Sequence, residues 1–253
     1  NYQSLVGNPT AFAFTNAQPG AILNLGNLNV AGGDLTLLGG TVVSTGQLSA
    51  PTGRLTVAAV PNQKLVRISQ PGQLLSLEIL PLAAGDNQPN NWQLPVASLP
   101  QLLTVGSAGN ATGLSVNNNG LVELTGTGFQ VQGGDVVATN QVTAQTATLA
   151  ANNNLTLVGN QLTTTGDLNL LAKNTVQIRD GAATPFSAQA GGNLDVQGDL
   201  GIDILALNNP ETPFQSGGDM SLVSDGIISG DSHFYSGGSF SVLTLPGQAA
   251  NVK

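Results

Sequence analysis

Few residues of this chain could do acid–base chemistry, and four of them are close in sequence. Asp195, Asp199, Asp203 and Glu211 form the densest acidic run. Paired carboxylates carry glycoside hydrolysis, and clustered carboxylates bind Ca²⁺. The strands of this chain recur at intervals of about 20 residues, so two carboxylates stack on each other only if they are about that far apart in sequence. Asp199 and Asp219 have this separation. We interpret the acidic run as polar turn residues and predict that the chain is not an enzyme.

Two other polar pairs are candidates for catalytic or metal-binding groups. Arg179 and Asp180 stand side by side at the end of an expected strand, where Asp180-Gly181 is explained by turn formation. His233 is the one histidine, and it would share a strand face with Asp231 only if that segment is extended. A lone histidine in a chain without cysteine makes a poor zinc site. The sequence therefore predicts no catalytic residue, no cofactor and no metal.

Composition argues against several classes of partner. The net charge is −8, and the six basic residues are scattered along the 253 residues, so no basic stripe is available for nucleic acid or for an acidic membrane surface. No apolar run approaches the roughly 20 residues of a membrane-spanning helix, and no membrane insertion is expected. Charged residues make up only 8%, against about 25% in ordinary soluble domains. Asn, Gln, Ser and Thr must cover the surface instead.

A short phrase that recurs through the chain indicates how these residues are positioned. Gly32-Gly33-Asp34-Leu35-Thr36-Leu37 returns 20 residues later as Thr52-Gly53-Arg54-Leu55-Thr56-Val57. A repeat this short cannot bury its own apolar face, so it must stack on copies of itself. Related copies begin at Gly133, Gly191, Gly217 and Gly237.

Three short alternating strands and three turns in about 20 residues are typical of one coil of a parallel β-helix. We therefore predict an all-β solenoid that forms a single domain over residues 1–253. Leu35 and Leu55, and likewise Met220 and Phe240, should lie in neighbouring coils with their side chains inward. Because the chain begins at Asn1 without Met, we expect it to be a piece of a longer protein.

One segment interrupts the repeat. Residues 80–107 contain four prolines and the single tryptophan, Trp92. Proline cannot donate to a sheet ladder, so the segment is predicted to leave the solenoid as an insertion. It either covers one solenoid face or acts as a binding loop, since insertions on rigid scaffolds often carry binding. Trp92 is the candidate partner-binding residue.

Several phrases resemble the filamentous-haemagglutinin-like exoproteins of cyanobacteria, which are passengers of the two-partner secretion pathway. The resemblance covers most of the chain, and the phrases that carry it are structural repeats. They are residues 5–14, 55–61, 65–70, 201–207 and 212–218. The family's secretion domain carries an Asn-Pro-Asn-Gly type of motif, whereas Asn8-Pro9-Thr10 does not match it. The chain would therefore lie downstream of that domain.

This resemblance implies a right-handed parallel β-helix that is secreted through an outer-membrane transporter of the two-partner pathway and is displayed on or released from the cell surface. The expected function is that of a structural segment of an adhesin-like exoprotein, with a surface polysaccharide or a protein as partner. Two alternatives remain open. One is a carbohydrate-active β-helix enzyme, a lyase or a glycosidase, and the other is a spacer that presents a separate effector domain.

Overall fold

The fold is described from a computed structural model. It covers residues 11–14, 19–60, 64–68, 77–81, 114–116, 122–124, 130–245 and 251–252. Every regular element within these ranges is a strand, so no helix long and apolar enough to cross a membrane occurs among them. The predicted all-β class with parallel sheets is confirmed.

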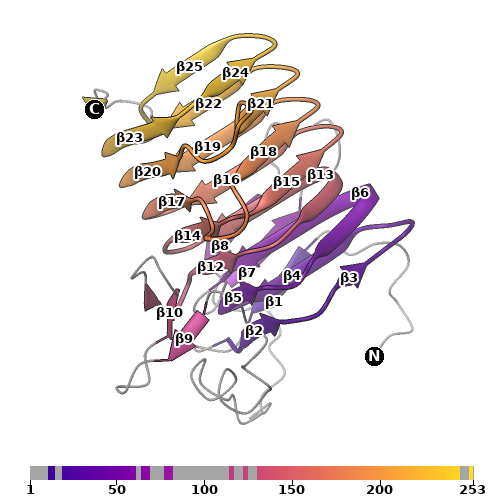
Figure 1. Ribbon diagram of the computed structural model, residues 1–253. Coiled ribbons are helices and arrows are strands. Elements are labelled where there is room, and N and C mark those ends of the chain that lie inside the picture. Colours follow the sequence, from indigo (N-terminus) through magenta and orange to yellow (C-terminus); the bar gives the residue numbers. More distant parts are fainter. Residues whose placement is uncertain are drawn as a thin grey trace, which may run out of the picture.

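The first parallel sheet is a single ladder of eight strands. Each strand pairs in parallel with the next, and the sheet runs along one side of the molecule (Figure 1). We call it the first ladder. Its strands are β2 (Ala21–Asn24), β5 (Thr41–Ser44), β12 (Val136–Ala138), β14 (Leu155–Val158), β17 (Thr175–Arg179), β20 (Gly201–Ala206), β23 (Ile227–Ser232) and β26 (Asn251–Val252).

The second parallel sheet has twelve strands and contains two ladders joined by two long strands, β6 (Leu48–Ala59) and β13 (Val142–Ala151). The first halves of these strands belong to the second ladder, with β3 (Leu28–Asn29), β15 (Gln161–Thr164), β18 (Ser187–Ala190), β21 (Phe214–Ser216) and β24 (Phe234–Ser236). Their second halves belong to the third ladder, with β4 (Leu35–Gly39), β16 (Leu168–Ala172), β19 (Leu194–Gly198), β22 (Met220–Val223) and β25 (Phe240–Leu243).

The chain runs through one strand of the first, second and third ladders in turn, and we call each such circuit of three strands a rung. Figure 1 shows the rungs piled in sequence order from β2 to β25. Leu35 pairs with Leu55 and Met220 with Phe240, as predicted. Leu55 and Met220 are fully buried. Phe240 shares the inward side with Met220, and its ring centroid lies 5.7 Å from that of Phe234. It is nevertheless 47% exposed, because β25 has a described strand on one side only.

The length of a rung is not constant. Asp34 and Arg54 in neighbouring rungs are 20 residues apart, whereas Asp167 and Asn193 are 26 apart. The prediction that Asp199 would stack on Asp219 is therefore wrong. Two chain segments, 180–186 and 207–213, lengthen the rungs between the first and second ladders. Asp199 instead lies beneath Asp225, whose backbone N–H donates to the Asp199 carbonyl at 3.2 Å.

The recurring Gly-Gly-Asp/Asn phrase has a clear structural role. The carboxylate of Asp167 accepts the backbone N–H of Asn193 at 2.8 Å, the side chain of Asn193 accepts that of Asp219 at 2.9 Å, and Asp219 accepts that of Ser239 at 2.7 Å. Each rung thus satisfies a turn donor of the next one. A Cβ at Gly218 would lie 2.3 Å from the Asn193 side-chain oxygen, so a larger residue there would displace this acceptor.

The departure from the ladders is longer than residues 80–107. Gln47 hydrogen-bonds to Gln141 in the next rung although 94 residues separate them, and β5 pairs directly with β12. The described strands within this departure are antiparallel. One sheet joins β7 (Lys64–Ile68) and β8 (Leu77–Pro81) to β1 (Ala11–Phe14), which precedes the ladders in the sequence. The other sheet joins β9 (Leu114–Val116), β10 (Val122–Leu124) and β11 (Gln130–Val131).

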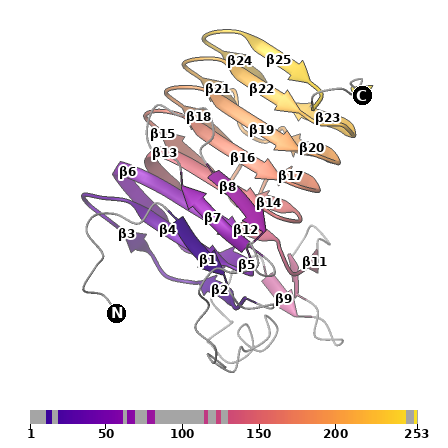
Figure 2. The ribbon, with the colours of Figure 1, turned by 180° about the vertical axis from the view of Figure 1, so that it is seen from behind.

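These antiparallel sheets contradict the prediction of ladder strands from one end of the chain to the other. The physical reason is that parallel and antiparallel strands share the same period-two alternation. The β1–β7–β8 sheet lies on the side of the molecule where β4 and β6 present their outer faces (Figures 1 and 2). Outward-pointing residues of β6 and β13, including Thr56, Ala58, Thr148 and Ala150, are buried there. The third ladder is therefore covered in its early rungs.

Apolar side chains fill the space between the ladders. Each inward position repeats at the same place in successive rungs, as in the fully buried Leu149, Leu170 and Val196. Aromatic rings continue this pattern in the later rungs. The ring centroids of Phe186 and Phe214 lie 5.2 Å apart, and those of Phe214 and Phe234 lie 4.9 Å apart.

Candidate functional site

Two surfaces of the described residues combine polar groups with exposure. The first lies around the two segments that lengthen the rungs, and we call it the loop corner (Arg179, Asp180, Asp203, Leu205 and Leu207). The second is the outward side of the second ladder, and we call it the neutral face. Its residues are Gln47, Ser49, Gln141, Thr143, Gln161, Thr163, Gln189, Gln215 and Tyr235.

Asp180 organises the loop corner. One carboxylate oxygen accepts the backbone N–H of Phe186 at 2.8 Å, and the other accepts those of Leu207 and Asn208, both at 2.8 Å. Asn209 donates its side-chain amide to the Phe186 carbonyl at 3.1 Å and so ties the two loops together. Asp180 was predicted to be a turn residue, and these bonds show it to be one that serves two loops.

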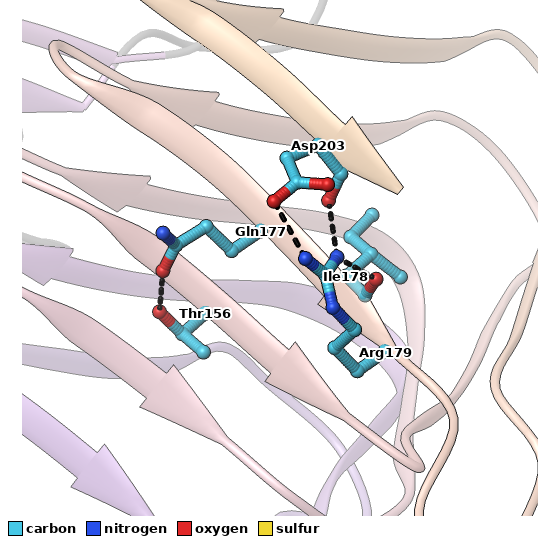
Figure 3. A network of polar contacts seen from close by, with 5 residues as sticks. All are labelled: Thr156, Gln177, Ile178, Arg179 and Asp203. Carbon is cyan, nitrogen blue, oxygen red and sulfur yellow. Dashed lines mark hydrogen bonds and ion pairs between the residues drawn. The ribbon is translucent and has the colours of Figure 1, made fainter. Parts of the chain in front are cut away.

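Arg179 lies beside this turn and forms an ion pair with Asp203 on the next strand of the first ladder (Figure 3). The guanidinium nitrogen and the carboxylate oxygen are 2.5 Å apart, and the guanidinium also donates to the backbone carbonyls of Ile178 and Asp203 at 2.9 Å. Figure 3 also shows Gln177 accepting a hydrogen bond from Thr156 at 3.1 Å. Leu205, which pairs in register with Arg179, and Leu207, whose backbone N–H donates to Asp180, are both exposed.

The structure does not bring the acidic run of the sequence together. Asp203 belongs to the ion pair, Asp195 accepts a hydrogen bond from Ser221 in the third ladder, and Asp199 accepts one from Gln197 at 2.9 Å. His233 is exposed and immediately precedes β24. Among the described residues, no group of three or more His, Cys, Asp and Glu side chains lies close enough to hold a metal ion.

The neutral face carries only amides and hydroxyls through most of its length. Register aligns Ser49, Thr143, Thr163, Gln189 and Gln215 in one column, which Tyr235 continues in the last rung. Gln47 donates to Gln141 at 2.9 Å in the column beside it. Among the described strands of the second ladder, no outward side chain is acidic or basic, and His233 immediately precedes β24. The other two ladders present outward charges such as Arg54, Asp195 and Asp203.

Asp135 is a buried carboxylate at the turn before β12, and sequence reasoning did not single it out. Its oxygens accept the backbone N–H groups of Gln132 and Asn154 at 2.7 and 2.9 Å and the side-chain amide of Asn153 at 2.7 Å. Burial raises the pKa of Asp135 above its usual 3.8, although these hydrogen bonds act in the opposite direction. The signal that could have found it is the Gly133-Gly134-Asp135 phrase, in which the aspartate repeats the turn role of Asp34.

This shift predicts a pH dependence of stability. A carboxyl whose pKa is higher in the folded state binds more protons when the protein is folded. Its favourable contribution to the free energy of unfolding is therefore complete below the pKa of the unfolded state, and it is lost as pH rises through the pKa of the folded state. We expect Asp135→Asn to flatten the fall in the free energy of unfolding between about pH 4 and neutrality. Denaturant unfolding of both proteins across this range measures the two slopes. Asp167→Asn is the control for a lost carboxylate, and equal slopes for wild type and Asp135→Asn would contradict the prediction.

Trp92, the predicted partner-binding residue, and residues 82–107 lie outside the described residues. Leu80 and Pro81, at the start of the predicted insertion, are the end of β8.

Comparisons with known proteins add no relative to this description. No protein-family model, no curated protein and no solved structure matches the chain. The functional argument therefore rests on the ladders and on the two surfaces.

Proposed function

We propose that this chain is a structural segment of a secreted, surface-associated, adhesin-like exoprotein, built as a right-handed parallel β-helix. The observation that supports the proposal is the register of the three ladders, which keeps the same inward and outward positions from rung to rung. A right-handed path is the usual one where the chain connects parallel strands. Such a stack presents long, repetitive and rigid outer faces, which suit extended contact with a surface.

The polar surface agrees with this role. Because outward positions carry hydroxyls and amides, the stack is suited to many modest hydrogen bonds along its length. Export through an outer-membrane transporter of the two-partner type, and a cell-surface location, come with the family resemblance and remain part of the proposal. Trp92 remains the proposed anchor for a partner within the segment 80–107.

Adhesion of coated beads tests the function. Beads that carry the folded chain should adhere to bacterial cells or to polysaccharide-coated surfaces, and Leu55→Asp, which is expected to unfold, should abolish adhesion at equal coating density. Trp92→Ala on the same beads should reduce adhesion if Trp92 is the anchor. Adhesion no better than that of bare beads would contradict the proposal. Release of reducing ends from a panel of polysaccharides would favour the enzyme instead.

A further inference from the structure

Apart from the loop corner, the neutral face is the described surface whose exposed side chains best suit binding, because it repeats hydrogen-bonding groups. Gln141, Gln161, Thr163 and Gln189 are exposed. Thr163 and Gln189 pair in register on neighbouring strands, Gln161 lies two residues before Thr163 on β15, and Gln141 immediately precedes β13. Successive strands of a sheet lie about 4.8 Å apart, so each column repeats a donor and an acceptor at that interval. The hydrogen bond between Gln47 and Gln141 holds two of these amides in place across neighbouring rungs.

Charge and polarity select the kind of partner. The protein carries a net charge of −8, and the residues of the neutral face, Gln47 and Gln215 among them, include no cation. An acidic polymer would therefore be repelled, with no basic side chain on this face to attract it. A stable protein interface needs a core of apolar anchors, and the amide and hydroxyl columns supply none. A neutral, hydroxyl-rich chain can exchange hydrogen bonds with amides and hydroxyls and demands no countercharge.

Tyr235 adds an aromatic group at the end of the same column. It is 61% exposed and follows Gln215 in register on β24. An exposed aromatic ring offers an apolar face on which a sugar ring can lie, while its hydroxyl remains available for a hydrogen bond.

We propose that the neutral face binds a neutral linear polysaccharide laid along the columns from Gln141 to Tyr235. This inference rests on the proposed adhesive function and names its ligand class. The amides and hydroxyls bond to the sugar hydroxyls of successive units, and Tyr235 stacks on one sugar ring.

Native affinity electrophoresis with soluble β-1,4-glucan, soluble α-1,4-glucan and alginate tests the proposal on the whole chain. We expect retardation by at least one neutral glucan and none by alginate. The double variant Thr163→Glu with Gln189→Glu should weaken glucan binding about tenfold, since it replaces two neutral hydrogen-bonding groups on exposed positions. The matched control is Leu200→Glu with Leu243→Glu, which adds the same charge at exposed positions outside the neutral face.

Tyr235 is tested by a graded pair. Tyr235→Phe keeps the ring and should retain most of the binding, whereas Tyr235→Ala should weaken it about fivefold. Melting curves of every variant show whether the fold is intact. Three outcomes would overturn the inference. They are retardation by alginate and not by glucan, no retardation by either glucan, and equal retardation of the control and test variants in a glucan gel. The adhesive function would survive those results if the beads still adhered, and it would fail separately if they did not.

Discussion

Leu55→Asp is expected to unfold the rungs around β6. Leu55 is fully buried, and in register it lies between Leu35 in the rung before and Ala147 in the rung after. An aspartate there would place a carboxylate among apolar neighbours with no group to pair it, at a cost of about 4 kcal/mol or more. Thermal unfolding followed by circular dichroism should show a melting temperature lowered by many degrees, or no cooperative transition.

The matched control places the same new charge on an outward position. Gln189→Asp alters an exposed side chain of β18 and should leave the melting temperature within a few degrees of the wild type. If Leu55→Asp behaved like this control, Leu55 would have to face outward, and the register of the third ladder would be shifted by one residue.

Gly226→Ala is expected to destabilise the later rungs almost as strongly. An added Cβ at Gly226 would lie 1.8 Å from the backbone carbonyl oxygen of Leu200 in the rung before, a separation that real atoms do not show. The obstruction is backbone and cannot rotate away, so β20 and β23 would have to move apart. We expect a loss of roughly 3 kcal/mol in the free energy of unfolding.

Gly32→Ala is the control for this change. No atom lies within 4 Å of a Cβ built there, and the backbone does not need a left-handed conformation. Reduced freedom of the unfolded chain should make Gly32→Ala neutral or slightly stabilising. Equal melting temperatures for the two variants would show that the rungs are not in close contact at Gly226.

The sequence by itself determined the strand texture and the contacts that depend on a local repeat. Leu35 and Leu55 could be paired from their shared phrase because a short amphipathic unit must stack on its own copy. The turn positions of Asp180 and Asp219 could also be predicted, because aspartate is favoured in turns next to strands. No such rule could specify which of these turns lies against which.

Only the tertiary structure decided the length of each rung and the direction of the interrupting strands. Loops 180–186 and 207–213 change the spacing from 20 to 26 residues, and this separates Asp199 from Asp219. Strands β7 and β8 alternate as the ladder strands do, yet they pair antiparallel. Alternation records which side chains share a face, whereas strand direction and stacking partner depend on contacts between residues far apart in the sequence. Asp203 illustrates the difference, because its partner Arg179 is 24 residues away and becomes a neighbour only when the rungs are stacked.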